Sequence, residues 1–119
     1  YDGLSGVSET GADERMLDTL CQYIMAHLAG PLNLSHLETI SGFSGRYLQM
    51  AFKKTFACSP MAWVKEQRLL RVRQLLLQRM DSPVDILAMS SGFHSMPAFY
   101  AAYKQRFGET PNATRRTGR

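Results

Sequence analysis

The sequence of 119 residues is poor in the features that mark several classes of protein. Its two cysteines are too few for a disulfide framework and fit a reducing compartment. It has no apolar run long enough to cross a membrane. Its three histidines have no ligand spacing, and no Ser-His-Asp order, phosphate loop or carboxylate pair stands out. We therefore expect a cytoplasmic protein that has no membrane partner, no metal and no cofactor, and that is not an enzyme.

Positive charge is abundant, but only in one part of the chain. Residues 1–41 carry one basic and six acidic side chains, a net charge of −5. Residues 42–119 carry 13 basic and four acidic side chains, a net charge of +9. A surface that binds a polyanion requires such an excess of Lys and Arg. The overall charge of +4 therefore conceals a strongly basic region that is a candidate for binding nucleic acid.

That basic region contains the same segment twice. The first copy, GFSGRYLQMAFKKTFACSP, begins at Gly42, and the second, GFHSMPAFYAAYKQRFGETP, begins at Gly92. Matched residues such as Pro60 and Pro111 are 51 positions apart, whereas the two glycines are 50 apart. A short apolar segment that suits a helix precedes each glycine. Each unit is therefore predicted to be a helix, a Gly-aromatic turn and a longer helix, which is the pattern of a helix-turn-helix.

A long uninterrupted helix is predicted between the two copies. Ser59 can cap it, Pro60 suits its first turn, and Asp81-Ser82-Pro83 ends it. Apolar residues recur every three or four positions along it, as a helix packed on a core requires. From Pro60 to Arg79, at about 1.5 Å per residue, this rod is roughly 30 Å long, and one turn of B-DNA is roughly 34 Å.

The remaining helix starts follow from capping residues. Ser35 with Glu38 has the spacing of a capping box, which predicts the start of the first short helix there. Ser44, Ser95 and Thr110 are each placed to cap the helix that follows them.

These elements together predict an all-α fold with two helix-turn-helix subdomains joined by a long central helix. Residues 1–12, rich in Gly, Ser and Thr, are expected to be a disordered linker or tail. The first subdomain is expected over residues 13–58 and the connecting helix over residues 59–80. The second subdomain is expected over residues 81–116, and residues 117–119 form a basic tail.

The longer helix of each unit presents an outward face that we predict to contact bases. On the first, Arg46, Gln49 and Lys53 are spaced so that they share one face. Arg can pair with guanine, Gln with adenine and Lys with phosphate. A solvated helix face is the commoner reading of such a pattern taken alone, but the repeat favours DNA. The predicted base-contacting residues are Arg46, Gln49, Met50, Met96, Pro97, Tyr100 and Ala101.

Phosphate contacts are predicted beside these two faces. They are Ser44, Lys53, Lys54, Arg71, His94, Ser95 and Lys104. The face of the second unit has fewer hydrogen-bonding groups than that of the first. We therefore expect the first unit to supply more of the base-specific energy and the second more of the positioning.

These residues make the chain resemble the C-terminal DNA-binding domain of the AraC/XylS family of bacterial transcription regulators. The family signature is matched by Gly92-Phe93, Phe99, Tyr103-Lys104, Phe107-Gly108 and Thr110-Pro111. The resemblance implies seven helices, with both recognition helices in successive major-groove segments of double-stranded DNA. It also implies regulation of transcription, most often activation, and contact with RNA polymerase. A separate sensing or dimerisation domain, absent from this chain, is implied as well.

Several positions depart from the family pattern, among them Glu38 and Ala101, and one other function stays open. Glu38 stands where the first unit usually has a small residue, and Ala101 where the second recognition helix often has Arg. The alternative function is a helical protein-protein interaction module whose outward faces bind a partner protein. The salt dependence of binding distinguishes these two functions. The affinity of DNA binding through Lys and Arg falls steeply with ionic strength, whereas the affinity of a hydrophobic groove interaction does not.

Overall fold

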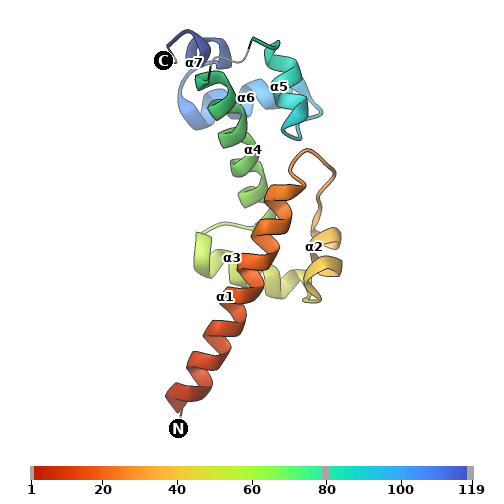
Figure 1. The fold of residues 1–119 in the computed structure, drawn as a ribbon, viewed down its shortest axis with the longest axis vertical. Coiled ribbons are helices and arrows are strands. Elements are labelled where there is room, and N and C mark those ends of the chain that lie inside the picture. The colour runs from red at the N-terminus through yellow and green to blue at the C-terminus, as the bar shows by residue number, and fades with distance from the viewer. Residues whose placement is uncertain (1, 79–80, 118–119) are drawn as a thin grey trace. The chain divides into compact units, whose positions relative to one another are not determined.

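The computed structural model describes residues 2–78 and 81–117, with side chains from Asp13 onward. Within these ranges the chain forms seven α-helices and no strand, which confirms the all-α prediction (Figure 1). The helices are α1 (Asp2–Ala26), α2 (Leu34–Ser41), α3 (Gly45–Phe56), α4 (Pro60–Leu77), α5 (Val84–Ser90), α6 (Met96–Phe107) and α7 (Pro111–Thr117).

The chain divides into two compact units. Unit 1 comprises the chain through His27 together with Leu32–Val64, and unit 2 comprises Leu28–Pro31 together with the chain from Lys65 onward. The boundary therefore falls within α4, which contributes residues to both units. The loop that follows α1 belongs to unit 2, although α1 itself belongs to unit 1.

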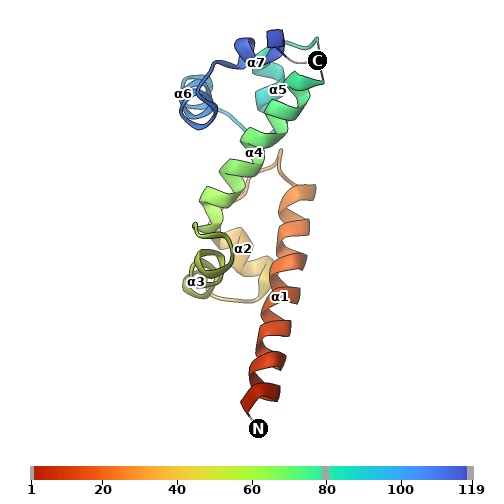
Figure 2. The same ribbon diagram turned by 90° about the vertical axis from the view of Figure 1, so that its left-hand side faces the viewer.

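Unit 1 is held by apolar residues from α1, α2, α3 and the first turn of α4. In both views α2 and α3 lie beside α1 (Figures 1 and 2). Trp63 packs against Phe52 and Phe56, with ring centroids 6.0 and 5.4 Å away, and so fixes the first turn of α4 to α3. The buried core residues are Leu17, Leu20, Ile24, Leu37, Leu48, Phe52 and Val64.

Unit 2 has its own core, formed by α4, α5 and α6. The buried hydroxyl of Tyr103 donates a hydrogen bond of 2.7 Å to Thr114 on α7, so this phenol is satisfied within the core. Its buried core residues are Leu69, Val72, Leu76, Val84, Leu87, Ala88, Phe99, Ala102 and Tyr103.

Some helix boundaries differ from those expected. Residues 2–12, expected to be a linker, form the first part of α1. Extending a helix whose later turns already pack on a core adds one hydrogen bond per residue, without the cost of nucleation. At the other end, Thr117 closes α7, and the remaining two residues of the predicted basic tail lie outside the described residues.

The cap of α2 and the end of α4 also differ. The side chain of Asn33 caps α2 by accepting from the His36 N–H at 2.9 Å, so the helix begins one residue before Ser35. Asn is as good a cap as Ser, and the sequence alone does not choose between them. The central helix ends at Leu77, before the expected end of residues 59–80, and residues 79–80 lie outside the described part of the chain.

Candidate nucleic-acid interface

The turn of unit 1 is built by local hydrogen bonds. Gly42 adopts a φ of 77° and ends α2, with its N–H donating to the Glu38 carbonyl at 2.8 Å. Ser44 then caps α3, as predicted, by accepting from the Tyr47 N–H at 3.1 Å. The direction in which α3 leaves the turn is therefore determined by the sequence between Gly42 and Tyr47.

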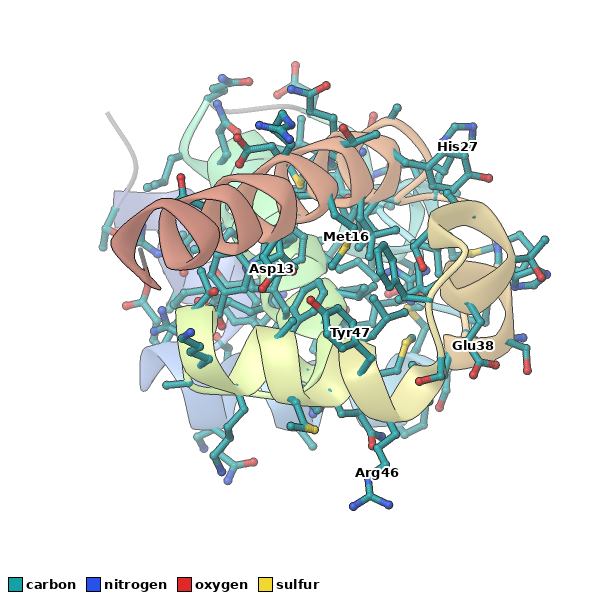
Figure 3. The ribbon with its side chains drawn as sticks, turned by 90° about the horizontal axis from the view of Figure 1, so that it is seen from below. Asp13, Met16, His27, Glu38, Arg46 and Tyr47 are labelled. Carbon is teal, nitrogen blue, oxygen red and sulfur yellow. The ribbon has the colours of Figure 1, made fainter. Side chains whose placement is uncertain are left out.

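Two carboxylates fix the first turn of α3 to the rest of unit 1. The side chain of Glu38 on α2 accepts a hydrogen bond from the Gly45 N–H. The side chain of Asp13 on α1 accepts one from the Tyr47 hydroxyl, and Figure 3 shows these two side chains pointing toward one another. A carboxylate at a helix N-terminus also meets the positive end of the helix dipole. From the sequence, Glu38 is expected to close a capping box with Ser35 and departs from the family pattern, whereas in the structure its side chain binds the Gly45 N–H at the start of the next helix.

The predicted reading face of unit 1 is brought together as one exposed surface of α3. Arg46, Gln49, Met50 and Lys53 are all exposed, Met50 with 63% of its surface accessible. In Figure 3 the Arg46 side chain points away from α1. This surface combines a guanidinium, an amide, a thioether and an ammonium, which can read base edges, touch a thymine methyl group and contact phosphate.

Lys54, also predicted to contact phosphate, lies elsewhere on α3. It lines a hollow together with Asp13, Glu14 and Leu17 of α1. The carboxylates of Asp13 and Glu14 thus line the same hollow as the Lys54 ammonium group. The sequence could not separate Lys54 from Lys53, because neighbouring residues on a helix differ in direction by about 100° and α1 had not been placed.

The corresponding face of unit 2 is only partly assembled. Ser95 caps α6, as predicted, with its oxygen 3.4 Å from the Ala98 N–H. Pro97, Ala101 and Lys104 are exposed, but Met96 is half-buried and packs on the core of unit 2. Most of the groups that α6 exposes here are therefore apolar.

Tyr100 on the same face already has a partner within the protein. Its hydroxyl donates a hydrogen bond of 3.0 Å to Asp85 on α5, and 36% of the residue's surface is exposed. Burial raises the pKa of Tyr100, and the hydrogen bond to Asp85 raises it further. The phenol is therefore protonated at neutral pH.

Arg68 of α4 connects the loop after α1 with the turn at Gly92 in unit 2. Its Nε donates to the Leu28 carbonyl at 3.0 Å and its Nη2 to the Gly30 carbonyl at 2.9 Å. Gly92 has a φ of 110°, and a Cβ added there would lie 2.3 Å from both Arg68 Nε and the Leu28 oxygen. Burial lowers the pKa of Arg68. This cation therefore serves the fold rather than a phosphate.

Other basic residues of unit 2 are also engaged within the protein. The Arg106 guanidinium pairs with Glu66 at 2.7 Å and lies 4.9 Å from the centre of the Phe107 ring. Arg73 lies on the same ring at 5.3 Å, so two cations flank one aromatic side chain. Arg115 belongs to α7 and donates to the Ser82 carbonyl.

The two remaining predicted phosphate contacts differ in exposure. His94, just before α6, is exposed, whereas Arg71 on α4 is half-buried. Both belong to unit 2.

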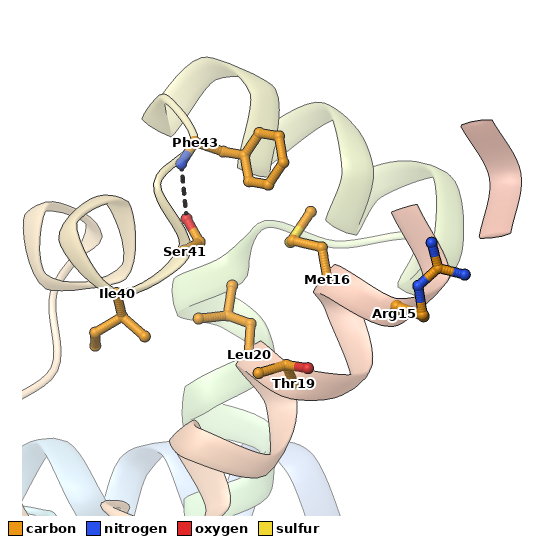
Figure 4. Close-up of a pocket in the computed structure, with 7 residues that line it drawn as sticks. All are labelled: Arg15, Met16, Thr19, Leu20, Ile40, Ser41 and Phe43. Atoms are coloured by element: carbon orange, nitrogen blue, oxygen red, sulfur yellow. Dashed lines mark hydrogen bonds between the residues drawn. The ribbon is translucent and has the colours of Figure 1, made fainter. Parts of the chain in front are cut away.

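A separate hollow of about 280 Å³ lies in unit 1, and none of its lining residues belongs to the predicted reading face (Figure 4). Within it the Phe43 N–H donates to the Ser41 hydroxyl at 3.1 Å. The lining residues are Arg15, Met16, Thr19, Leu20, Ile40, Ser41 and Phe43. Apolar side chains dominate this lining, and Arg15 provides its one charge.

The described residues contain neither a candidate metal site nor a membrane-spanning helix. In residues 13–78 and 81–117, no three His, Cys, Asp or Glu side chains are grouped so that they could hold a metal ion. None of the described helices is long and apolar enough to span a membrane.

Comparison with known proteins finds similarity to bacterial regulators. A family model described as a helix-turn-helix domain matches residues 37–117. The HTH-type transcriptional regulator ExsA of Pseudomonas aeruginosa is 35% identical over 101 residues, which cover 85% of this chain and 36% of ExsA. The virulence regulon transcriptional activator VirF of Yersinia enterocolitica is 46% identical over 66 residues, 56% of this chain and 24% of VirF. The chain thus spans about a third or less of these curated relatives.

A solved structure matches over most of its length. It is described as a transcriptional regulator with an AraC-type DNA-binding domain, from Chromobacterium violaceum. It superposes with a TM-score of 0.81 at 28% identity, covering 89% of this chain and 94% of that one.

Proposed function

The chain belongs to the AraC-type helix-turn-helix family, and on that basis we propose that it binds double-stranded DNA sequence-specifically to regulate transcription. In this proposal α3 and α6 are recognition helices that enter successive major-groove segments about one turn apart. The observation that carries the proposal is the exposed face of α3, where Arg46, Gln49 and Lys53 project from a helix tied to α1 and α2. A helix held in this way presents its side chains in a fixed register, as base reading requires.

The chemistry of the two faces suggests how each would act. Arg46 would pair with the acceptors of guanine, Gln49 with adenine, and Met50 with a thymine methyl group. In unit 2, Pro97 and Ala101 would make apolar contacts, and Lys104 would contact phosphate. The hydroxyls of Ser44 and Ser95 already accept hydrogen bonds from backbone N–H groups, so they would donate their own protons to phosphate.

The wider role is proposed from the relatives. VirF is described as a transcriptional activator, and this favours activation for the present chain. Activation would involve contact with RNA polymerase, and the greater length of the curated relatives leaves room for a sensing or dimerisation domain. Such a regulator would act in the bacterial cytoplasm, bound to the nucleoid.

The test is selection of binding sites from a randomised duplex library, followed by titration of the selected DNA against salt. Two short conserved blocks about one turn apart are expected. Each phosphate contact should add about −0.9 to the slope of log affinity against log salt. Absence of enrichment, or binding that salt does not affect, would instead support a protein-protein interaction module.

Matched lysine substitutions sharpen this test. Lys53→Ala and Lys104→Ala should weaken binding about equally for all sequences and reduce the salt slope by about 1 each. Lys65 is exposed on α4 and has no predicted contact, so Lys65→Ala is the control for the loss of one positive charge. If Lys65→Ala has the same effect as the other two, the assigned phosphate contacts are wrong.

A further inference from the structure

The bond between Tyr100 and Asp85 determines what the tyrosine can offer to a ligand. Tyr100 lies on the exposed face of α6, and Asp85 lies in the first turn of α5. The hydroxyl oxygen is 3.0 Å from Asp85 Oδ1, a distance that fits a direct hydrogen bond. More than a third of the Tyr100 surface nevertheless remains open to solvent.

A phenol has one proton to donate and lone pairs to accept with, whereas an ionised carboxylate can only accept. The proton of Tyr100 must therefore point to Asp85. Toward a third group, the Tyr100 hydroxyl oxygen can therefore only accept a hydrogen bond, through its lone pairs. A tyrosine without such a partner could rotate its hydroxyl and either donate or accept.

The edges that the bases present in the major groove differ in whether they donate or accept hydrogen bonds. Adenine and cytosine present an amino group, which donates, whereas thymine presents O4, and guanine presents O6 and N7, which accept. We propose that Asp85 makes Tyr100 an acceptor toward the major groove, so that unit 2 selects adenine or cytosine on the strand that Tyr100 faces. This inference rests on the proposed function, because it assigns a base preference to one side chain of the α6 face.

Tyr100 is influenced by one negative and one positive side chain, Asp85 and Arg115. Burial raises the pKa of Tyr100, the hydrogen bond and charge of Asp85 raise it further, and the Arg115 cation acts in the opposite direction. Arg115 is tied to the Ser82 carbonyl, shortly before α5 begins. The Arg115 cation therefore acts on Tyr100 in the direction opposite to the Asp85 carboxylate.

The repeat shows how the two units would differ at this position. Tyr100 corresponds to Gln49, 51 residues earlier, and Asp85 to Ser35, 50 residues earlier. The amide of Gln49 can donate and accept at once, which suits a bidentate contact with adenine. The tyrosine of unit 2, held by Asp85, can only accept. Equivalent positions would then read different properties of the base edge.

The experiment compares binding sites selected from a randomised duplex library by the wild-type chain and by three variants. For the wild type, one position of the second block should favour adenine or cytosine by about 3- to 10-fold, the effect of a single hydrogen bond. Tyr100→Phe should abolish this preference. Asp85→Ala, which frees the phenolic proton, should let guanine and thymine rise to a similar frequency at that position.

Asp81→Ala is the matched control. Asp81 is exposed and precedes α5, so its removal makes the same change of charge without freeing Tyr100. This variant should bind all DNA somewhat more tightly and keep the base preference. Circular dichroism and urea unfolding of each variant would show whether it is folded.

The outcomes separate this inference from the proposed function. If no block is enriched for any folded variant, DNA reading itself is refuted. If the first block is retained but Tyr100→Phe changes no position of the second, the assignment of Tyr100 is refuted. A wild-type preference for guanine or thymine at the Tyr100 position, or loss of the preference in Asp81→Ala, would also overturn it.

Discussion

The two units repeat one backbone plan but place different chemistry on it. In unit 1 the exposed face of α3 combines a guanidinium, an amide and an ammonium from Arg46, Gln49 and Lys53. In unit 2 the matching face of α6 has a half-buried Met96, exposed apolar groups and a tyrosine already bonded to Asp85. Backbone geometry and capping are thus shared, while the groups that would contact DNA are not. A repeat in the sequence predicts equal folds, and equal contribution to binding is a separate question.

The turns of the two units also share a backbone conformation but differ in what surrounds their glycine. Both Gly42 and Gly92 adopt positive φ angles, of 77° and 110°. A Cβ at Gly42 would meet nothing within 4 Å, whereas one at Gly92 would clash with Arg68 and the Leu28 carbonyl. Glycine is therefore needed at the first turn for its conformation alone, and at the second for conformation and space together.

The largest expected effect is a difference in stability between alanine variants of these two glycines. Gly92→Ala should lower the free energy of unfolding by more than about 3 kcal/mol, because it adds a backbone clash and displaces Arg68. Gly42→Ala should cost only about 1 kcal/mol, for the left-handed conformation. Urea unfolding of both variants measures this. Equal losses would mean that the close approach at Gly92 is relieved by a small shift of the loop.

The next effect concerns the inequality of the reading faces. Arg46→Ala or Gln49→Ala should each reduce discrimination between the preferred and a substituted base pair by about 1–3 kcal/mol. Gln105→Ala, at an exposed position of α6 with no predicted DNA contact, is the comparison and should leave discrimination unchanged. Competition binding with single-base variants of the selected site provides the measurement. A loss of discrimination from Tyr100→Phe as large as that from Arg46→Ala would contradict the predicted asymmetry.

A smaller effect tests how α3 is held. Glu38→Ala should lower the free energy of unfolding by about 1.5 kcal/mol, because it leaves the buried Gly45 N–H without its charged partner. Glu38→Gln keeps an acceptor oxygen and should recover part of this loss. Glu14→Ala, at an exposed position of α1, controls for charge. If all three variants unfold at the same urea concentration, the bond to Gly45 contributes nothing to stability.

The smallest effect compares the ends of the two recognition helices. The C-cap residue that follows α6 is Gly108, and the one that follows α3 is Ala57, a non-glycine residue with a φ of 62°. Ala57→Gly should raise the free energy of unfolding by up to about 1 kcal/mol, because it relieves the left-handed strain but adds unfolded-state entropy. Thermal unfolding would detect the increase. A decrease would show that the added entropy outweighs the strain.

Local signals in the sequence predicted the helices and most of their starts. Ser44, Ser95 and Thr110 were each placed correctly, since a cap depends only on residues nearby in the chain. Residues with distant partners were not predicted. The acceptors of Arg68 are 38 and 40 residues earlier, and nothing in the spacing links them. The half-burial of Met96 and the contact of Lys54 with the α1 hollow likewise depend on packing.

The place of Leu28–Pro31 limits how far the chain can be treated as modular. This loop lies between two parts of unit 1, yet it supplies the carbonyls that Arg68 holds and that Gly92 approaches. A fragment starting at Lys65 would leave a partly buried guanidinium without acceptors. A chimera that exchanges the first half with a relative would import a foreign loop beneath the second turn. Under the proposed function, grafting a new DNA specificity onto this scaffold therefore has to change surface residues of α3 and α6, because the two halves cannot be exchanged whole at the boundary between Val64 and Lys65 in α4.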